Sequence, residues 1–567
     1  MSRLALPTLR AAPNATPGPS SVPARYFHGC WLVAPRTTPR VQPSSTRYRN
    51  VRFNYTASGQ VLAPIGVPHK GVAFEELSNG LSASQPCFGA RGDEISLLSS
   101  PQEFYGTLLE MIGRAKRRII ISSLYIGAEE SELVEALQAA LKKRPYLRVT
   151  IILDYHRATR LSKSTDHPPS TAHLLLPLLE QYSDRCEVWL YRSPKLRGIM
   201  ERIVPDRYDE GWGTWHGKWY GIDDEVIISG ANLASSYFSN RQDRYIHFRS
   251  HPSLLSYLSS LTRLFTQYSY LLSPSPPPSI SRHHLVPLPQ PPGSSKFFGT
   301  ASLVWPTPSI HPRAFSQHAL ATLSAFQKSW KASNASRMRR VDVDTYFWPV
   351  IQAGVLGIKE EEAALGKVWE AVRSAHATED ERVSVDLTSG YFGLYKAYKR
   401  AVIDSPAPFR VIAASPKANG FYGSAGLSRL IPEGYTFLER RFWQDAQSKD
   451  RLWQGADDRG VRLKEWEREG WTYHSKGIWV SPIKPQSAPF MTFIGSSNLS
   501  TRSLQLDTEL SILLSTSSPS LRRALGAEVK ALDKHAVDVG EETWKKEERQ
   551  VSLLAKVLIA LGIDGML

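Results

Sequence analysis

Apolar and amphipathic stretches follow one another in the same order in the two halves of the chain. In the first half, apolar runs at 117–126 (RRIIISSLYI) and 147–155 (LRVTIILDY) predict two buried strands. Between them, 131–144 (SELVEALQAALKKR) repeats leucine at helical spacing, which predicts an amphipathic helix. The second half gives strand, helix and strand in the same order, at 382–392, 393–402 and 409–416. The recurrence indicates an internal duplication.

Alternation of strand, helix and strand predicts an α/β fold, because a parallel connection needs a crossover that packs on the sheet. We expect two duplicated domains, each a mixed, largely parallel sheet flanked by helices, with an active site at their interface. A Pro/Ser-rich stretch at 273–295 predicts a linker, since it forms neither helix nor sheet easily. The expected divisions are a tail (1–74), an N-terminal domain (75–272), a connecting region (273–340), a C-terminal domain (341–540) and a helical tail (541–567).

The first 74 residues carry a disproportionate share of the positive charge. The net charge of the chain is +16, and this segment contains nine Lys or Arg and no Asp or Glu. Arginines spaced among Ala, Leu, Ser and Thr without acids are typical of a mitochondrial transit peptide. A disordered basic arm is the alternative. Because over half of the excess charge falls in this tail, the remainder gives little support to nucleic-acid binding.

Cysteine usage and hydropathy exclude some classes of protein. The three cysteines are widely spaced and form no CxxC pair, so neither a disulfide framework nor a structural zinc site is expected. No run of eighteen apolar residues predicts a membrane span. No carboxylate cluster stands at metal-binding spacing, and we expect no metal and no cofactor.

A repeated motif carries the chemistry. In the first half, His216, Lys218 and Asp223 form HxKxxxxD; Asn232 follows sixteen residues after the histidine and Asp243 eleven residues later. Residues i and i+2 of a strand point to one face, so the histidine and lysine project together, and a hairpin turn at Asp223 returns the asparagine beside them.

The second half repeats this constellation at the same Asn-to-acid spacing of eleven, in the residues His474, Lys476, Asn498 and Glu509. Ser481 stands where the second motif requires Asp. Either that acid serves mainly to hold a short hairpin and is dispensable where the loop is longer, which we favour, or the second half is degenerate. One HxK pair arises easily by chance, whereas two matched sets do not.

Two facing sets of this kind suit phosphodiester chemistry. One histidine attacks phosphorus to form a phosphohistidine, and the other protonates the leaving oxygen and then deprotonates the acceptor. The lysines and the two asparagines, Asn232 and Asn498, would stabilise charge on the non-bridging oxygens. Asp243 and Glu509 would orient a histidine and raise its basicity.

These residues resemble the HKD motifs of the phospholipase D superfamily. Within it, the phrases SGANLASSYFSNRQDRY, YFWPVIQAG, DLTSGYF, ASPKANGF and YHSKGIWVS are similar to those of mitochondrial phosphatidylglycerophosphate synthases. The similar phrases extend from about residue 122 to 510, which is most of the chain outside the tails.

The resemblance implies a reaction, a location and partners. Its substrates would be CDP-diacylglycerol and sn-glycerol 3-phosphate, and its product phosphatidylglycerophosphate, a precursor of cardiolipin. By analogy, His216 is the nucleophile and His474 the general acid/base, with the reverse assignment open. The enzyme would contact the anionic mitochondrial inner membrane peripherally, on its matrix face, and would bind no nucleic acid.

Three basic residues, His156, Arg157 and Arg160, follow the second predicted strand, where α/β folds often bind ligands. They would bind the glycerol phosphate or the diphosphate, or else form a solvated loop. A phosphodiesterase or nuclease of the same fold, with water as acceptor, is the alternative function, because transferase and hydrolase share the covalent step.

Overall fold

The computed structural model describes residues 71–162, 166–198, 204, 206–275, 285–291, 301–337, 342–424, 426–454, 459–484 and 487–560. The chain divides into two compact units, 1–61 and 62–567, and every described residue lies in the second. The predicted transit peptide therefore falls almost wholly outside the described residues. Within the described ranges, no helix is both long enough and apolar enough to span a bilayer.

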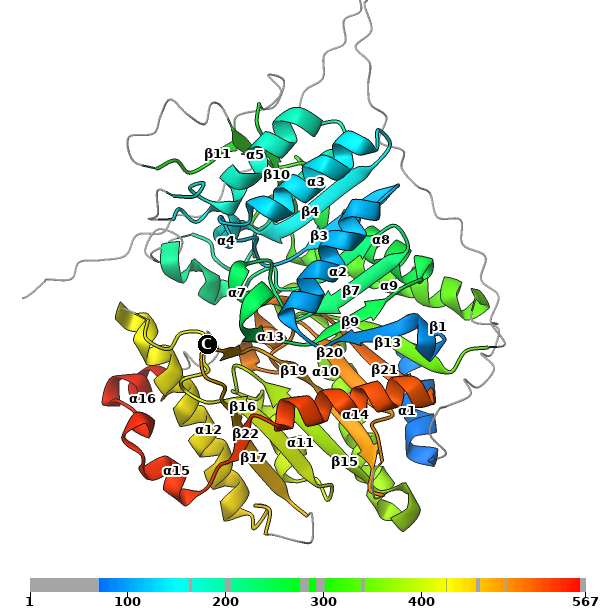
Figure 1. The fold of residues 1–567 in the computed structure, drawn as a ribbon, viewed down its shortest axis with the longest axis vertical. Helices are drawn as coiled ribbons and strands as arrows, with labels where there is room; N and C mark the ends of the chain where they lie inside the picture. The colour runs from blue at the N-terminus through cyan, green and yellow to red at the C-terminus, as the bar shows by residue number, and fades with distance from the viewer. Residues whose placement is uncertain are drawn as a thin grey trace, which may run out of the picture. The chain divides into compact units, whose positions relative to one another are not determined.

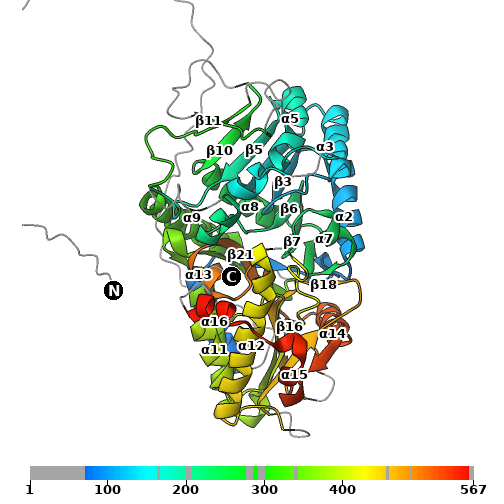
Figure 2. The same ribbon diagram turned by 90° about the vertical axis from the view of Figure 1, so that its left-hand side faces the viewer.

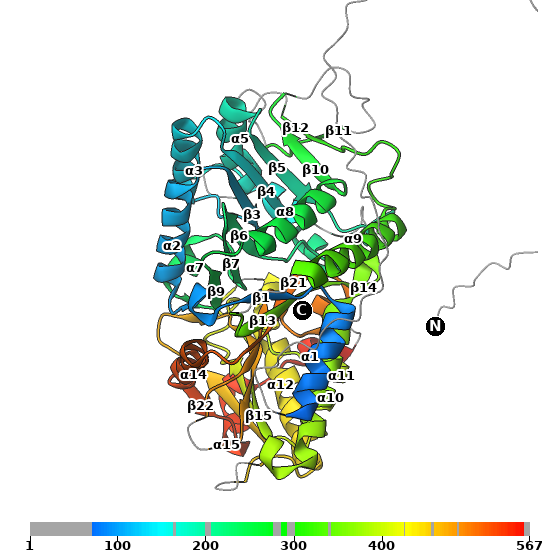
Figure 3. The ribbon, with the colours of Figure 1, turned by 90° about the vertical axis from the view of Figure 1, so that its right-hand side faces the viewer.

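The first half is built on a ten-stranded sheet (Figure 1). Its order is β11-β12-β10-β5-β4-β3-β6-β7-β9-β2. Helices α2 and α3 lie on one face and α8 and α9 on the other (Figure 3). The strands are β2 (Ile95–Leu98), β3 (Arg118–Ser122), β4 (Arg148–Asp154), β5 (Cys186–Tyr191), β6 (Trp219–Ile222), β7 (Glu225–Ser229), β9 (Tyr245–Phe248), β10 (Ser269–Ser273), β11 (Leu285–Pro287) and β12 (Ser302–Val304). The helices are α2 (Pro101–Arg114), α3 (Ser131–Lys143), α4 (Tyr155–Thr159), α5 (Thr171–Tyr182), α7 (Ser235–Ser239), α8 (Pro252–Thr266) and α9 (Ser316–Arg337).

The second half repeats this architecture in the order β1-β13-β21-β20-β19-β15-β16-β17-β22, with β14 paired to β13. Helix α14 lies on one face of the sheet, and α10, α11 and α12 lie on the other (Figures 2 and 3). The strands are β1 (Phe88–Ala90), β13 (Thr345–Ala353), β14 (Ile358–Lys359), β15 (Val383–Ser389), β16 (Phe409–Ala414), β17 (Val461–Trp466), β19 (Lys476–Pro482), β20 (Met491–Gly495), β21 (Thr508–Thr516) and β22 (Ala536–Asp538). The helices are α1 (Val72–Ser84), α10 (Glu360–Ser374), α11 (Lys396–Ile403), α12 (Leu430–Ser448), α13 (Thr501–Gln505), α14 (Pro519–Asp533), α15 (Glu541–Lys545) and α16 (Leu553–Ala560).

The predicted strand–helix–strand units are confirmed in both halves. They appear as β3, α3 and β4 and as β15, α11 and β16, and each pair of strands is parallel. The sheets are mixed, as expected, but not largely parallel. Within the described strands of these two large sheets, only β3-β4-β5 and β15-β16-β17 pair in parallel, because the other strands are joined by hairpins or close the sheet edges antiparallel.

The segment at the start of the expected N-terminal domain packs with the second half of the chain. Helix α1 begins at Val72 and buries Phe74 in the core of the second half, edge-to-face with Phe490 at 4.9 Å between ring centroids. Strand β1 then adds an antiparallel edge to β13. The first-half sheet begins only with β2. The apolar residues of α1 predict that the helix packs on a core, but they do not indicate which of the two similar cores.

The connecting region at 273–340 is more than a linker. Although it is rich in proline, it supplies β11 and β12 to the first sheet, with Pro287 at the sheet edge where a missing N–H is tolerated. It also supplies the 22-residue helix α9. The expected helical tail at 541–567 contains α15 and α16, and α16 packs against α12.

Candidate active site

The two HxK segments lie at the interface, and each pairs with the backbone of the opposite half. The His216 N–H donates to the Thr508 carbonyl at 2.8 Å, next to a parallel bridge between Trp215 and Thr508. In the other half, β18 (Thr472–Tyr473) pairs in parallel with β8 (Arg241–Gln242), and the His474 N–H donates to the Gln242 carbonyl at 2.8 Å. The halves are thus joined by two matching ladders that place the motifs.

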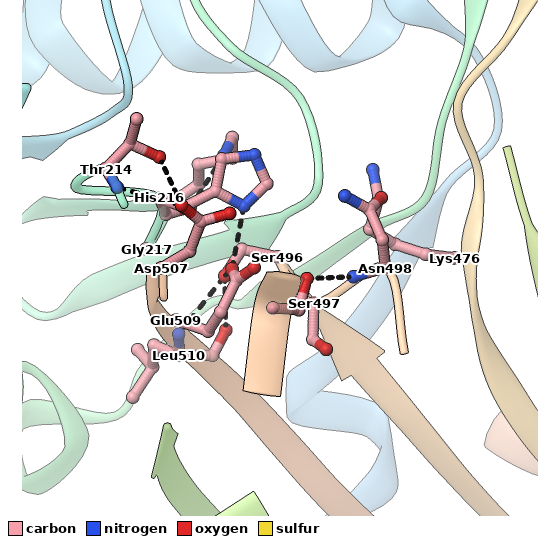
Figure 4. A network of polar contacts seen from close by, with 12 residues as sticks. Thr214, His216, Gly217, Lys476, Ser496, Ser497, Asn498, Asp507, Glu509 and Leu510 are labelled. Atoms are coloured by element: carbon pink, nitrogen blue, oxygen red, sulfur yellow. Dashed lines mark hydrogen bonds and ion pairs between the residues drawn. The ribbon is translucent and has the colours of Figure 1, made fainter. Parts of the chain in front are cut away.

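Each histidine is held by an acid from the opposite half. Nδ1 of His216 lies 2.8 Å from Oε2 of Glu509, and Nδ1 of His474 lies 2.6 Å from Oδ2 of Asp243 (Figure 4 shows the first pair). Both acids are buried, and Ser496 also donates to Glu509. These contacts leave Nε2 of each ring as the nitrogen turned away from its acid. A carboxylate on Nδ1 fixes the tautomer and strengthens Nε2 as a nucleophile or base.

The lysines lie beside their own histidines. Nζ of Lys218 donates to the His216 carbonyl at 2.6 Å, and Nζ of Lys476 donates to the His474 carbonyl at 2.7 Å. Gly230 lies so close to the second lysine that a Cβ there would come within 2.8 Å of Nζ. Both lysines are buried, so a bound phosphate would meet their charge at short range and low local dielectric.

Burial sets the protonation of this site. It lowers the pKa of Lys218 to about 7 and that of Lys476 to about 8, against the opposing pull of Glu509 and Asp243. Burial also lowers the pKa of both histidines, and that of His474 falls well below its usual range because Lys476 adds to the effect. Before a substrate enters, both imidazoles are therefore mainly neutral near pH 7.

The pKa values of the two carboxylates, Glu509 and Asp243, shift in opposite directions. Burial alone would raise the pKa of Glu509, but His216 and Lys218 outweigh it and hold the pKa at about 2. Burial raises the pKa of Asp243, with Lys476 opposing. The His216 pair thus contains a firmly ionised acid, whereas the His474 pair holds its negative charge less strongly.

The two asparagines occupy matching places. Asn232 donates from Nδ2 to the Tyr237 hydroxyl at 2.9 Å. The buried Oδ1 atoms of Asn232 and Asn498 have no hydrogen-bond partner among the described residues. A half-turn of an asparagine amide exchanges the places of its oxygen and its NH2 group. Either amide can therefore present an N–H to a bound oxyanion.

Comparison with known proteins identifies the family. Residues 108–264 match the family model "Cardiolipin synthase, PLD-like domain". The chain is 33% identical over 516 residues to the CDP-diacylglycerol–glycerol-3-phosphate 3-phosphatidyltransferase of Schizosaccharomyces pombe, covering 86% of this chain and 97% of that one. It belongs to this transferase family. The mitochondrial enzyme of Mus musculus is 34% identical, with 84% of each chain covered.

A solved structure shows the same fold. The phosphatidylserine synthase of Haemophilus influenzae aligns over 87% of this chain and 99% of its own, with a TM-score of 0.60 and 18% sequence identity. The expected duplicated phospholipase D-like architecture and the expected family are therefore confirmed.

Asp223, grouped with the catalytic residues from its place in the first motif, lies elsewhere. It is at the far end of β6 from His216, in the β6–β7 turn, with φ of 53°. Its carboxylate accepts from the backbone N–H groups of Lys116, Arg117 and Arg118 at 2.8, 2.8 and 3.1 Å. These contacts make it an anchor for the hairpin rather than a group at the reacting phosphorus.

The position of Ser481 agrees with the interpretation that the motif's acid anchors a hairpin. Ser481 lies within β19, which continues to Pro482, so the chain makes no tight turn there. Just beyond the strand, the Ile483 N–H donates to the Arg382 carbonyl at 2.9 Å. Main-chain pairing thus secures the longer loop of this second hairpin without a carboxylate. The position supports the dispensable-anchor interpretation over degeneration of the second half.

The predicted basic group after β4 is paired with acids. Nδ1 of His156 lies 3.1 Å from Oδ2 of Asp209, and Arg157 and Arg160 both contact Glu210. The Arg157 guanidinium also lies 4.2 Å from the centroid of the Tyr125 ring. The three residues are not a solvated loop. Their charge is largely balanced within the protein, so substrate binding by them remains a prediction.

The sequence did not predict which groups enclose His474. Its ring lies edge-on between Tyr237 and Tyr391, at 5.2 and 5.4 Å between centroids. Arg241 donates to the Tyr237 hydroxyl at 2.9 Å and helps to lower the pKa of His474. The place of Arg241 two residues before Asp243 was a usable signal, but His474 itself is remote from it in sequence.

One group of donors at the site has metal-binding geometry. Ligand atoms of His216, Asp507 and Glu509 lie within 4.8 Å of one another. However, Asp507 already accepts from Thr214 at 2.8 Å and from Arg502 at 2.9 Å. Glu509 is likewise engaged with His216. The existing hydrogen bonds explain this cluster without a cation.

Proposed function

We propose that this protein transfers the phosphatidyl group of CDP-diacylglycerol to sn-glycerol 3-phosphate, giving phosphatidylglycerophosphate and CMP. Family membership supports the reaction, since the relatives named above carry that activity in their names. The observation that carries the chemistry is the pair of buried histidines, each oriented by an acid from the other half. The product is a precursor in cardiolipin synthesis.

The first half-reaction forms a phosphohistidine. Nε2 of His216 attacks the phosphorus that bears diacylglycerol, and the bond from that phosphorus to the oxygen of CMP breaks. The leaving group is the phosphate monoester CMP, which departs readily as an anion. Its departure therefore does not require a proton from His474. Lys218, Lys476 and an amide N–H of Asn498 stabilise the negative charge on the non-bridging oxygens.

The second half-reaction needs a base. The 1-hydroxyl of glycerol 3-phosphate attacks the phosphohistidine, and Nε2 of His474 takes the hydroxyl proton as the P–N bond to His216 breaks. The low pKa of His474 suits this step, because the ring is unprotonated when the alcohol arrives. The firmly ionised Glu509 beside His216 stabilises the positive charge that this ring gains on phosphorylation, which supports the nucleophile role for His216 and leaves the base role to His474.

The test uses purified full-length protein and CDP-diacylglycerol labelled in the phosphate next to diacylglycerol, with no added metal. We expect labelled phosphatidylglycerophosphate only when glycerol 3-phosphate is present, and acid-labile label on the protein when it is absent. Phosphatidic acid as the main product in both reactions would indicate a phosphodiesterase with water as acceptor. Cleavage of DNA or RNA alongside no lipid transfer would indicate a nuclease and would overturn the proposal.

We propose further that the enzyme contacts a membrane with the surface around α16. Leu553, Leu554 and Val557 are 78, 50 and 44% exposed on this helix, although they are apolar. On the neighbouring loop, Tyr422 is 57% exposed. Such residues suit insertion at the boundary between lipid headgroups and acyl chains.

This surface is connected to the site through helix α12. The Ser552 N–H, at the start of α16, donates to Glu433 in the first turn of α12 at 2.9 Å. Two residues further along α12, Tyr435 stacks on Tyr391, which contacts His474. The same helix therefore contacts both the proposed membrane surface and the ring that packs on His474.

Sedimentation with phosphatidylcholine vesicles containing phosphatidylglycerol tests the contact. The double variant Leu553→Ser/Val557→Ser should bind vesicles at least about tenfold more weakly than wild type. Burial of each of these apolar side chains in the lipid stabilises the bound state by roughly 1.5–3 kcal/mol. The matched control is Ile483→Ser/Val537→Ser, which removes two exposed apolar residues elsewhere. Equal binding of the two double variants would refute this surface.

A mitochondrial location, on the matrix face of the inner membrane, completes the proposal. Four vertebrate relatives are named as mitochondrial enzymes, and residues 1–74 have a transit-peptide composition. A fluorescent protein fused after residue 74 should enter mitochondria, and protease protection in mitoplasts should place the full chain in the matrix. A cytosolic fusion would contradict the targeting role of the tail.

A further inference from the structure

A second pocket lies in the first half, away from the two histidines. Its volume is about 650 Å³, and it opens at the amino ends of β3, β4 and β5, whereas His216 lies near their carboxyl ends. Its polar and charged lining residues are Arg117, Arg118, Arg148, Thr150, Arg185, Glu187, Ser259 and Arg263. Five arginines and one acid thus face one cavity.

The fold explains why these arginines converge. Arg118 and Arg148 are register partners on the adjacent parallel strands β3 and β4, so their side chains leave the sheet on the same face. Arg185 immediately precedes β5, the next strand along. Arg263 reaches the same place from α8, which crosses that face. The cluster is a consequence of parallel pairing, not of neighbouring positions in sequence.

Only part of this positive charge is balanced by carboxylates. Arg117 pairs with Asp224 at 2.6 Å, and Arg185 lies 3.5 Å from Asp184. By contrast, Arg118 donates to the Asp223 carbonyl at 3.2 Å, and Arg148 donates to the Asp184 carbonyl at 3.3 Å.

Arg118 and Arg148 form no ion pair with any carboxylate among the described residues. The Arg263 side chain has neither an ion pair nor a hydrogen bond within the same part of the structure. Glu187, the one acid in the lining, accepts from the Trp189 indole at 3.1 Å. Three guanidinium charges therefore remain uncompensated around one cavity.

We propose that this pocket is a binding site for a polyanion bearing phosphate groups. Like charges held together around a cavity repel one another, and a bound anion relieves that repulsion. Guanidinium groups match phosphate oxygens two at a time, which makes arginine suited to phosphate recognition. The volume lies within the range of ligand pockets and accommodates a diphosphate or the headgroup of an anionic phospholipid.

The pocket does not depend on the proposed transfer reaction. It contains none of the residues assigned to that chemistry, and it lies at the opposite end of β6 from the first motif, next to the turn that contains Asp223. A soluble phosphate compound and a lipid headgroup share the chemistry that the arginines recognise. The experiment therefore separates these two sources.

Titration calorimetry of the full chain with inorganic pyrophosphate tests the site. Two binding events are expected in wild type, one at the histidine site and one at the arginine pocket. In Arg148→Gln/Arg263→Gln, the event at the pocket should weaken by about tenfold or more, because two charge-assisted contacts are lost. Both side chains are exposed, so the variant should fold normally, as circular dichroism would check.

The matched control is Arg382→Gln/Arg523→Gln, which removes two exposed arginines from the second half and the same net charge. It should retain both binding events. Vesicles of phosphatidylcholine with phosphatidic acid then identify the source: competition between these vesicles and pyrophosphate indicates a headgroup site, and pyrophosphate binding alone indicates a soluble ligand. Identical titrations of the pocket variant and the control would overturn the proposal.

Discussion

Replacement of Glu509 by glutamine tests the central feature of the site, the orientation of one histidine by an acid from the other half. Glutamine has nearly the same shape and keeps an oxygen that can accept from Nδ1 of His216, but it carries no charge. The histidine should stay in place and lose only its electrostatic partner. The variant therefore separates positioning by shape from stabilisation by charge.

The size of the effect follows from the pKa of the carboxyl group. It lies at about 2 instead of 4.5, even though burial acts in the opposite direction. The difference between these two values corresponds to about 3 kcal/mol of attraction between the carboxylate and the groups around it, chiefly His216 when charged and Lys218. Since positive charge develops on His216 as it is phosphorylated, loss of that attraction should lower kcat by roughly 100- to 1,000-fold.

Rapid-quench measurement of CMP release and of label on the protein shows which half-reaction is affected. If His216 is the nucleophile, Glu509→Gln slows the first release of CMP. The matched variant Asp243→Asn acts on His474, so it should allow CMP release but slow transfer to glycerol 3-phosphate, and phosphohistidine should accumulate. Exchanged results would assign the roles of the two histidines in reverse. A kcat for Glu509→Gln within about threefold of wild type would refute the electrostatic argument itself.

Three further predictions follow from buried or constrained groups. Asp223→Ala removes an acceptor of three backbone N–H groups, so thermal unfolding should show a loss of about 2–4 kcal/mol, with kcat of the folded enzyme nearly unchanged; a selective loss of kcat would return this acid to the catalytic group. Burial raises the pKa of Glu361 from 4.5 to about 8, so the free energy of unfolding of wild type should fall as pH rises from 4.5 to 8. In urea unfolding near pH 8, Glu361→Gln should be more stable than wild type by about 2–5 kcal/mol, and parallel pH profiles of the two proteins would contradict this. Gly477 has φ of 150°, and a Cβ there would lie 1.9 Å from Nη1 of Arg244, so Gly477→Ala should cost more than about 2 kcal/mol by the same assay. Gly540→Ala should not, because a Cβ at that position would meet no atom within 4 Å.

Local signals in the sequence are enough to predict the repeated units of this fold. Strand β3 is buried on both faces and is a nearly continuous apolar run, β15 (VSVDLTS) alternates apolar and polar residues, and α3 shows a plain helical period. Edges of the sheets were harder to predict. Strand β11 lies in a proline-rich stretch, and β1 is only three residues long and joins the sheet of the other half. Such pairings depend on tertiary contacts that no local pattern encodes.

The site shows the same division between local and remote information. His216 and Lys218 lie two residues apart in the segment just before β6, so their proximity could be predicted. The equal spacing from asparagine to acid in both halves also indicated that Asp243 and Glu509 are equivalent. It did not indicate that each acid crosses the interface, because a pairing within one half satisfies the same spacing. Only the two backbone ladders between the halves distinguish the arrangements.

This crossing has a consequence for the duplicated architecture. In a half taken alone, His216 would lack the acid that orients it, and Asp243 would lack its histidine. The same interface also carries the main-chain bonds that place both motifs, so docking of the halves and assembly of the site are one event. The divergence of the second motif at Ser481 fits this view, since Ser481 lies at the end of β19 that points away from His474. The residues that touch the other half, His474, Lys476 and Glu509, keep the pattern that the chemistry requires.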